Sequence, residues 1–391
     1  MSGVGAGADA TGSGPTGASA GRRLAAERAG VAPAWTARAG SSREFGRTRN
    51  AAYWIFVGAA AVGCVMLGWP ILDDVSTSLP KLGDVAFWAL AGLGGYAIVT
   101  RADLNWSVPG KVRLAALAWG VCCVPLSQQL VGWAGGTAAV PDWWRTAGYA
   151  PLFEEAVKLL GVVLIAFGVP AVCGRPLGAL VLGMLSGLGF TIVRNLERGN
   201  EGIGAGGALP DVLLAHSLGP APWAHLTCTG IAALGIWWVV AYRNRPLPTR
   251  ILLAAGFFLL AVAMHILQDA FGRTLGRASD AAFADLLVPF GYAAMQLLVL
   301  VALVLWARWR DRWWFRTLTL AGLPPVLDTA EAASLRTRGS RRRARRAGVT
   351  REVQKTQLRY ANAISDGDDS TAEDMLHRER LLRIGQQNRP V

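Results

Sequence analysis

Eight apolar runs follow one another from residue 52 onward, and each is close to the length that crosses a lipid bilayer. A helix needs about 20 apolar residues to span the roughly 30 Å of hydrocarbon, and helices are expected because every backbone group must be paired there. The runs lie at 52–72, 84–100, 112–135, 147–169, 176–194, 218–241, 250–271 and 284–307. The sequence therefore predicts an all-α fold, a polytopic integral membrane helical bundle of about eight transmembrane helices.

Arginine and lysine gather beside every second loop between these runs. Basic residues lie after the second, fourth, sixth and eighth runs, at Arg101, Lys111, Arg113, Arg175, Arg243, Arg245, Arg250, Arg308, Arg310 and Arg312. Such residues concentrate on the cytoplasmic side of membrane proteins. The pattern predicts a multi-pass protein of the cell (plasma) membrane with both termini in the cytoplasm.

The net charge of +13 has the same origin, because most arginines lie in the two tails and in short loops. Basic segments beside a membrane attract anionic lipids. We therefore expect membrane lipids as partners of the basic segments and no binding of nucleic acid. The composition, 52% hydrophobic and only 17% charged, excludes an ordinary soluble domain.

The chain divides into three parts. Residues 1–50 are rich in Gly, Ala, Ser and Arg, and we expect a disordered basic N-terminal tail there. Residues 51–307 form the transmembrane core, and residues 308–391 form a basic cytoplasmic C-terminal tail. Short amphipathic helices are predicted in that tail at 348–364 and 370–384. The five cysteines do not have the spacing of a metal site. We expect them to be buried and to pack as small hydrophobic residues.

Three ionisable residues interrupt the fourth apolar run, at Glu154, Glu155 and Lys158. A charge within a bilayer costs roughly 2.5–3.5 kcal/mol, so ionisable residues in a span mark a functional site by default. Their expected partners are polar residues of the sixth and seventh runs, namely His225, His265 and Asp269.

The predicted topology places these residues at one depth. The fourth and sixth runs enter from the outside and carry Glu154, Glu155 and His225 in their outer halves. The seventh run ends outside, with His265 and Asp269 near that end and on one helical face. A shared depth is what a single polar site near the extracytoplasmic face requires.

Two chemistries are open to such a set. Carboxylates and histidines can hold a divalent metal that activates water, with one glutamate as general base. Without a metal, a glutamate activates water directly while a histidine stabilises the oxyanion. Either arrangement hydrolyses a peptide bond near the membrane surface. A proton relay in a transporter also places acids and histidines in spans.

Four motifs in order resemble those of a known family. The first resembles the P-x-x-EE-x-x-K signature of PrsW-type intramembrane proteases, which are related to CAAX-processing and bacteriocin-processing membrane proteases. The others resemble the later motifs of that family. In order, the four motifs are Pro151–Lys158, Gly187–Phe190 followed by Asn195, His225–Gly230 and Leu260–Asp269. The resemblance covers roughly residues 147–271.

The resemblance implies that Glu154, Glu155, His225 and His265 are active-site residues and that Asp269 is accessory. It implies a metalloprotease that cuts membrane-anchored proteins, such as anti-sigma factors, at an extracytoplasmic site. We expect Glu155 to be the general base. His225, His265 and Glu154 are the candidate ligands of a metal, with Zn²⁺ as the candidate ion. The Gly-, Ala- and Arg-rich composition is associated with high-GC bacteria.

One position departs from the family pattern, because Arg194 stands where the second motif has glutamate. A permanent cation replaces an acid, so the chain could bind no metal or could be an inactive relative. Glu197, one turn later, could substitute in part. The alternative function is a catalytically inactive PrsW-like membrane scaffold or signalling protein. A transporter is less favoured, since no inverted repeat or broken-helix pair is evident.

Overall fold

The computed structural model describes most of the chain beyond residue 50. The described residues are 51–73, 79–103, 108–137, 148–204, 223–242, 244–275, 282–320, 335, 338–346, 348–349, 351–366, 375, 377–379 and 381–382. The predicted disordered tail at 1–50 lies outside them.

All regular structure in this part of the chain is helical, which confirms the predicted all-α class. The elements are α2 (Ala51–Asp73), α3 (Leu79–Ala102), α4 (Gly110–Thr137), α6 (Ala150–Gly168), η3 (Pro170–Cys173), α7 (Pro176–Gly204), α9 (Ala224–Ala241), α10 (Leu247–Leu275), α11 (Ala282–Leu320), α13 (Arg338–Arg346) and α14 (Arg351–Asp366). Each of the eight predicted spans overlaps one helix from α2 to α11, and residues 147 and 218–222 of the predicted spans lie outside the described residues.

Six of these helices, α3, α4, α7, α9, α10 and α11, have the length and apolarity to cross a membrane. The two others differ for separate reasons. Helix α6 is 19 residues long and carries Glu154, Glu155 and Lys158. Of α2, the part compared by length and apolarity is the shorter helical stretch Ala51–Met66. The chain is therefore a polytopic membrane bundle.

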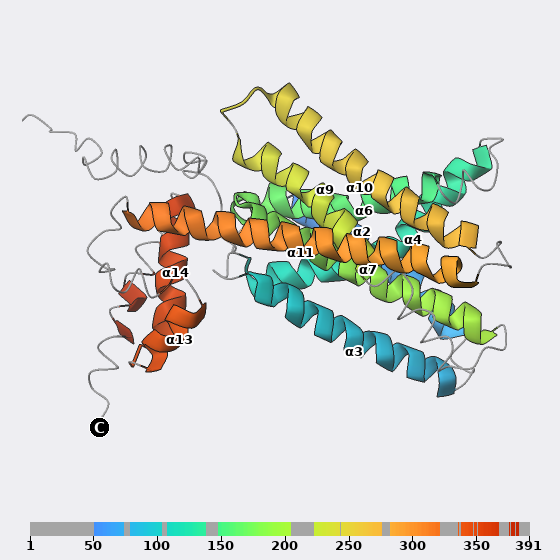
Figure 1. The fold of residues 1–391 in the computed structure, drawn as a ribbon, viewed down its shortest axis with the longest axis horizontal. Helices are drawn as coiled ribbons and strands as arrows, with labels where there is room; N and C mark the ends of the chain where they lie inside the picture. Colours follow the sequence, from blue (N-terminus) through green and yellow to red (C-terminus); the bar gives the residue numbers. More distant parts are fainter. Residues whose placement is uncertain are drawn as a thin grey trace, which may run out of the picture.

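The long helices run roughly parallel to one another, with α7 and α9 inside the bundle (Figure 1). Most residues in the spans of α7 and α9 are buried, whereas fewer than a quarter of those in the spans of α3, α10 and α11 are. Leucine is the most frequent of their exposed large hydrophobic residues, as expected of helices that face lipid. The two interior helices thus form the frame on which the others pack.

Small residues explain the close approach of α7 to α9. A Cβ atom on Gly183 would lie 2.6 Å from the Cβ of Ala233, and one on Gly187 would collide with the carbonyl oxygen of His225. Glycines four residues apart let two membrane helices approach closely. This packing fixes the backbone of His225 against α7.

Helix α6 is held between α4 and α7 at the turn that follows its two glutamates. Trp119 of α4 donates a hydrogen bond from Nε1 to the carbonyl of Val157 at 2.8 Å. A Cβ on Gly161 would collide with the Trp119 ring. Ser186 of α7 donates to the carbonyl of Lys158 at 3.1 Å. These contacts fix the rotation of α6 and hence the direction of its ionisable side chains.

The predicted boundary between the transmembrane core and the C-terminal tail, at residue 308, falls inside a helix. Helix α11 continues without a break across this residue to Leu320. Asp311 in this extension pairs with Arg175, which precedes α7, at 3.0 Å. Helices α13 and α14 lie crosswise at the C-terminal end of α11 (Figure 1). Helix α14 matches the prediction at 348–364, and short helical pieces between 375 and 382 fall in the prediction at 370–384.

The cysteines are all free, and four of the five are buried as expected. The expectation is wrong for Cys64, which is exposed. The reason is the place of α2 at the edge of the bundle, where half of its surface has no protein neighbour. The sulfur of Cys64 lies 3.0 Å from that of Cys122 on α4.

Candidate active site

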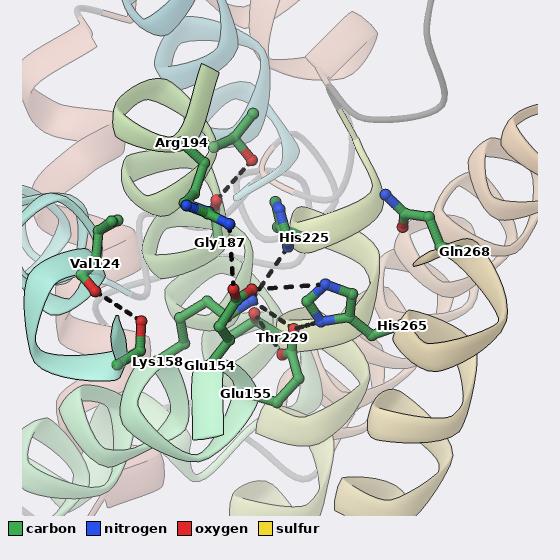
Figure 2. Close-up of polar contacts among 12 residues, drawn as sticks. Val124, Glu154, Glu155, Lys158, Gly187, Arg194, His225, Thr229, His265 and Gln268 are labelled. Carbon is green, nitrogen blue, oxygen red and sulfur yellow. Dashed lines mark hydrogen bonds and ion pairs between the residues drawn. The ribbon is translucent and has the colours of Figure 1, made fainter. Parts of the chain in front are cut away.

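Four helices bring polar side chains together at one end of the bundle. Glu154 and Glu155 lie near the start of α6, and His225 lies near the start of α9. Arg194 and His265 lie toward the ends of α7 and α10. Figure 2 shows these side chains pointing into one space. The shared depth predicted from the sequence is therefore a property of the fold.

Glu155 is fully buried and both of its carboxylate oxygens have partners. Oε1 accepts a hydrogen bond from Lys158 Nζ and lies 3.0 Å from His265 Nδ1. Oε2 accepts a hydrogen bond from Thr229 Oγ1 at 2.9 Å. Three helices thus fix the orientation of this carboxylate.

Glu154 is buried but held less tightly. Its Oε2 lies 3.6 Å from His265 Nε2, and its Oε1 lies 3.8 Å from Arg194 Nη2. The two glutamates point in different directions from α6, since successive helical residues differ by about 100°. They nevertheless meet the same imidazole, because His265 presents one ring nitrogen to each.

Lys158 places a positive charge in the middle of this cluster. Its side chain is fully buried, and besides Glu155 it meets His225 Nδ1 at 3.2 Å. The Nζ atom also lies 4.2 Å from the centre of the Phe190 ring, a cation–π contact. The ammonium compensates the charge of Glu155 in a place from which water is largely excluded.

Three of the clustered residues could hold a metal ion. Glu154, His225 and His265 each offer one ligand atom, and the three atoms lie within 4.8 Å of one another. Two histidines and one carboxylate form a ligand set of catalytic zinc sites, in which the fourth position stays open for water or substrate. The donor set fits a divalent ion after small movements of these side chains toward one centre.

Asp269 lies apart from these three residues. It is half-buried and is not among the three candidate ligands. Its charge nevertheless acts on both Arg194 and His265. The structure therefore brings Glu154, Glu155, His225 and His265 into direct contact range and leaves Asp269 as a neighbouring charge.

Arg194 lies between two acids. Its Nη1 pairs with Glu197 Oε2 at 2.8 Å, while its Nη2 faces Glu154 at 3.8 Å. Glu197 is held from the other side by Gln128, whose Nε2 donates at 3.0 and 3.1 Å. Glu197 therefore lies one turn beyond the cluster and is joined to it through Arg194.

Sequence reasoning missed part of the environment of Glu155. Thr229 is not among the predicted site residues, although it donates a hydrogen bond to Glu155. The contact of Lys158 with His225 was also missed. Thr229 lies four residues after His225, on the same face of α9, and this spacing was the available signal.

Comparisons with known proteins bear on the whole cluster. A family model described as PrsW family intramembrane metalloprotease matches residues 108–308, just over half of the chain. The matched range runs from the start of α4 into α11 and contains every residue of the site. Comparisons with curated proteins and with solved structures gave no match. The chain belongs to the PrsW family of intramembrane metalloproteases.

Proposed function

We propose that this protein hydrolyses a peptide bond of a membrane-anchored protein at the extracytoplasmic side of the plasma membrane. The observation that carries the proposal is the buried contact of two glutamates on α6 with His265 on α10, beside His225 on α9. Buried carboxylates and histidines in contact are the groups that peptide hydrolysis by activated water needs.

Glu155 is the proposed general base. A carboxylate oxygen can accept two hydrogen bonds, and Oε2 of Glu155 accepts one from Thr229. The remaining position can take a proton from the attacking water and deliver it to the leaving amine. Lys158 and His265 keep the carboxylate in one orientation during this transfer.

Glu154, His225 and His265 are the proposed ligands of a divalent metal, with Zn²⁺ as the candidate. When bound, such an ion supplies a polarised water and a positive charge for the developing oxyanion. Glu154 is the carboxylate best placed for this role, because its two contacts are longer than those of Glu155. Asp269 is proposed to orient His265 through its charge.

A membrane-anchored protein, such as an anti-sigma factor, is the proposed substrate class. The site lies at the ends of α7 and α10, opposite the end that holds Arg175. If the basic loops are cytoplasmic, the site faces outward, and both termini lie in the cytoplasm. The proposed cut is therefore near the outer surface of the membrane.

A non-catalytic scaffold is the second candidate, and one observation favours it. Arg194 faces the candidate metal ligand Glu154 at 3.8 Å. A permanent cation at this distance opposes a divalent ion and occupies the carboxylate instead. In this case the fold and the basic helices would serve binding alone.

The test compares membranes that contain either the wild type or Glu155→Gln. Glu352→Gln, an exposed glutamate on α14, is the matched control. N-terminal fragments of membrane proteins are identified by mass spectrometry at equal abundance of the three chains. Fragments present with the wild type and the control, and absent with Glu155→Gln, are expected. The same fragments with all three chains would favour the scaffold.

A further inference from the structure

Two buried amides beside the active site have no part in the proposed chemistry. Gln268 of α10 is 6% exposed and Gln296 of α11 is fully buried. Gln296 donates from Nε2 to Gln268 Oε1 at 3.3 Å. Gln296 Oε1 is buried without a hydrogen-bond partner among the residues that the structure describes. An unpaired polar atom in a membrane costs several kcal/mol, so this acceptor requires an explanation.

Contacts join the amide pair to the two helices that carry the histidines of the site. Gln268 follows His265 by three residues and so lies on the same side of α10, and Figure 2 shows the two side chains on the same helix. Tyr292 of α11 donates to the carbonyl of Met264, the residue before His265. Thr227 of α9 lies 3.5 Å from the carbonyl oxygen of Gln296. These contacts place the amides between α10 and α11 at the edge of the catalytic cluster.

The two helices that carry the amides also form part of the outer surface of the bundle. Leu267, next to Gln268, is 46% exposed, and Leu298, two residues after Gln296, is 69% exposed. Gln268 and Gln296 therefore lie on two helices that each have a lipid-exposed side. A membrane-anchored chain that entered from the lipid between α10 and α11 would bring its main chain to these amides.

We propose that Gln268 and Gln296 form a subsite that binds the main chain of an unwound substrate segment. The proposal rests on the proposed function. A transmembrane helix must open locally before a peptide bond can be attacked, and lipid cannot pair the N–H and C=O groups that opening frees. Gln296 Oε1 accepts such an N–H, and the Gln268 amide nitrogen donates to a C=O. The subsite binds the main chain of the substrate and does not select a side chain.

A purely structural role makes a different prediction. Amide pairs can join membrane helices, with model peptides giving about 1–2 kcal/mol per contact. In that case Gln296→Leu would lower the melting temperature. In a backbone subsite the same change removes a buried unpaired acceptor together with the long hydrogen bond to Gln268. We expect the two effects to offset each other, so that the melting temperature stays unchanged while cleavage slows.

The first experiment detects binding without requiring cleavage. A photo-cross-linking residue replaces Gln268 in the full-length Glu155→Gln chain in cell membranes. This variant keeps the unpaired acceptor of Gln296 and reports a chain that lies against it, and the matched control places the probe at Leu267, which is 46% exposed. Protein adducts at position 268 in at least about fivefold excess over position 267 are expected. Lipid adducts alone at both positions would overturn the subsite.

The second experiment measures how fast Gln296→Leu forms the fragments that the wild type produces. The matched control is Gln129→Leu, which changes an exposed glutamine of α4. Loss of the backbone contacts is expected to slow fragment formation about tenfold at unchanged melting temperature. An unchanged rate would overturn the subsite while the proposed function stood. Adducts at position 268 with no fragment from the wild type would support the subsite and reject the proteolytic function.

Discussion

At the scale of single residues, two cations balance the two glutamates of the site. Lys158 contacts Glu155, and Arg194 faces Glu154. The pairs differ in tightness, because Lys158 bonds directly and is fully buried whereas Arg194 is 3.8 Å away and divides its charge with Glu197. The first pair is suited to fixing a carboxylate, and the second pair is suited to exchange with another cation.

The buried pair of Lys158 and Glu155 should be strongly coupled in stability. Lys158→Met leaves the Glu155 charge without its closest cation, and we expect a loss of about 3–5 kcal/mol in the free energy of unfolding. The double variant Glu155→Gln with Lys158→Met should lose less than the sum of the single losses. Chemical unfolding in detergent micelles measures this cycle. Additive losses would show that the two side chains do not interact.

Arg194 should weaken the binding of a divalent ion through its charge. Arg194→Gln removes a cation near Glu154, so we expect Zn²⁺ to bind about tenfold more tightly, or about 1.4 kcal/mol. Competition with a chromophoric chelator gives the dissociation constant. Arg175→Gln removes a cation at the other end of the bundle and should leave that constant unchanged. Equal affinities of wild type and Arg194→Gln would contradict this role of Arg194.

The sequence predicted four of the residues that meet, but it placed Asp269 with them, left Arg194 out and did not predict how they pair. Their positions along the spans placed Glu154, Glu155, His225 and His265 at one depth. The pairing of Lys158 with Glu155, and the contact of both glutamates with His265, depend on helix rotation and side-chain rotamers. These are set by packing partners such as Trp119 on α4, which lies far from α6 in the sequence.

At the scale of elements, α7 determines where α9 lies and hence where His225 lies. The glycine face of α7 meets the start of α9 at the carbonyl of His225. The structure thus couples a packing feature to the position of a proposed metal ligand. A change on α7 can therefore alter the site without touching an ionisable residue.

Gly187→Ala tests this coupling. The added methyl would collide with the carbonyl oxygen of His225, so we expect a loss of about 1–3 kcal/mol in stability and a reduced rate of fragment formation. Gly256→Ala on α10 is the control, because a Cβ there meets no atom within 4 Å. Thermal unfolding and the fragment assay measure both variants. Normal activity of Gly187→Ala would show that His225 tolerates displacement.

The existence and order of the long helices followed from hydropathy, because a membrane imposes one length on every span. The end of α11 did not follow from it. The sequence becomes polar after residue 307, yet the helix continues to Leu320. The buried contact of Asp311 with Arg175 stabilises this extension. Such a contact joins distant segments and leaves no periodic signal in the sequence.

At the scale of the whole molecule, the ends of the helices divide the protein into two faces. The polar cluster lies at one face, and the end of α9, the start of α10 and the extension of α11 lie at the other (Figure 1). The basic residues Arg175, Arg245 and Arg250 belong to the second face. The positive-inside rule predicts that this second face is cytoplasmic.

Reporter fusions test this orientation. Alkaline phosphatase, which is active only outside the cytoplasm, is expected to be active when inserted at 276–281 and inactive when inserted at 243–245. A fluorescent protein at the C-terminus is expected to fluoresce, because that terminus is predicted to be cytoplasmic. The reverse pattern would place the polar cluster on the cytoplasmic face and exclude an extracytoplasmic cut.

The most direct test of the account is cleavage by the purified protein alone. The wild type and Glu155→Gln are each reconstituted into liposomes with a membrane protein whose fragment was found in the paired membranes, and new N-termini are measured by mass spectrometry. The account predicts that the wild type produces the same fragment and that an equal amount of Glu155→Gln produces none. Equal cleavage by both chains, or no cleavage by the wild type, would contradict it.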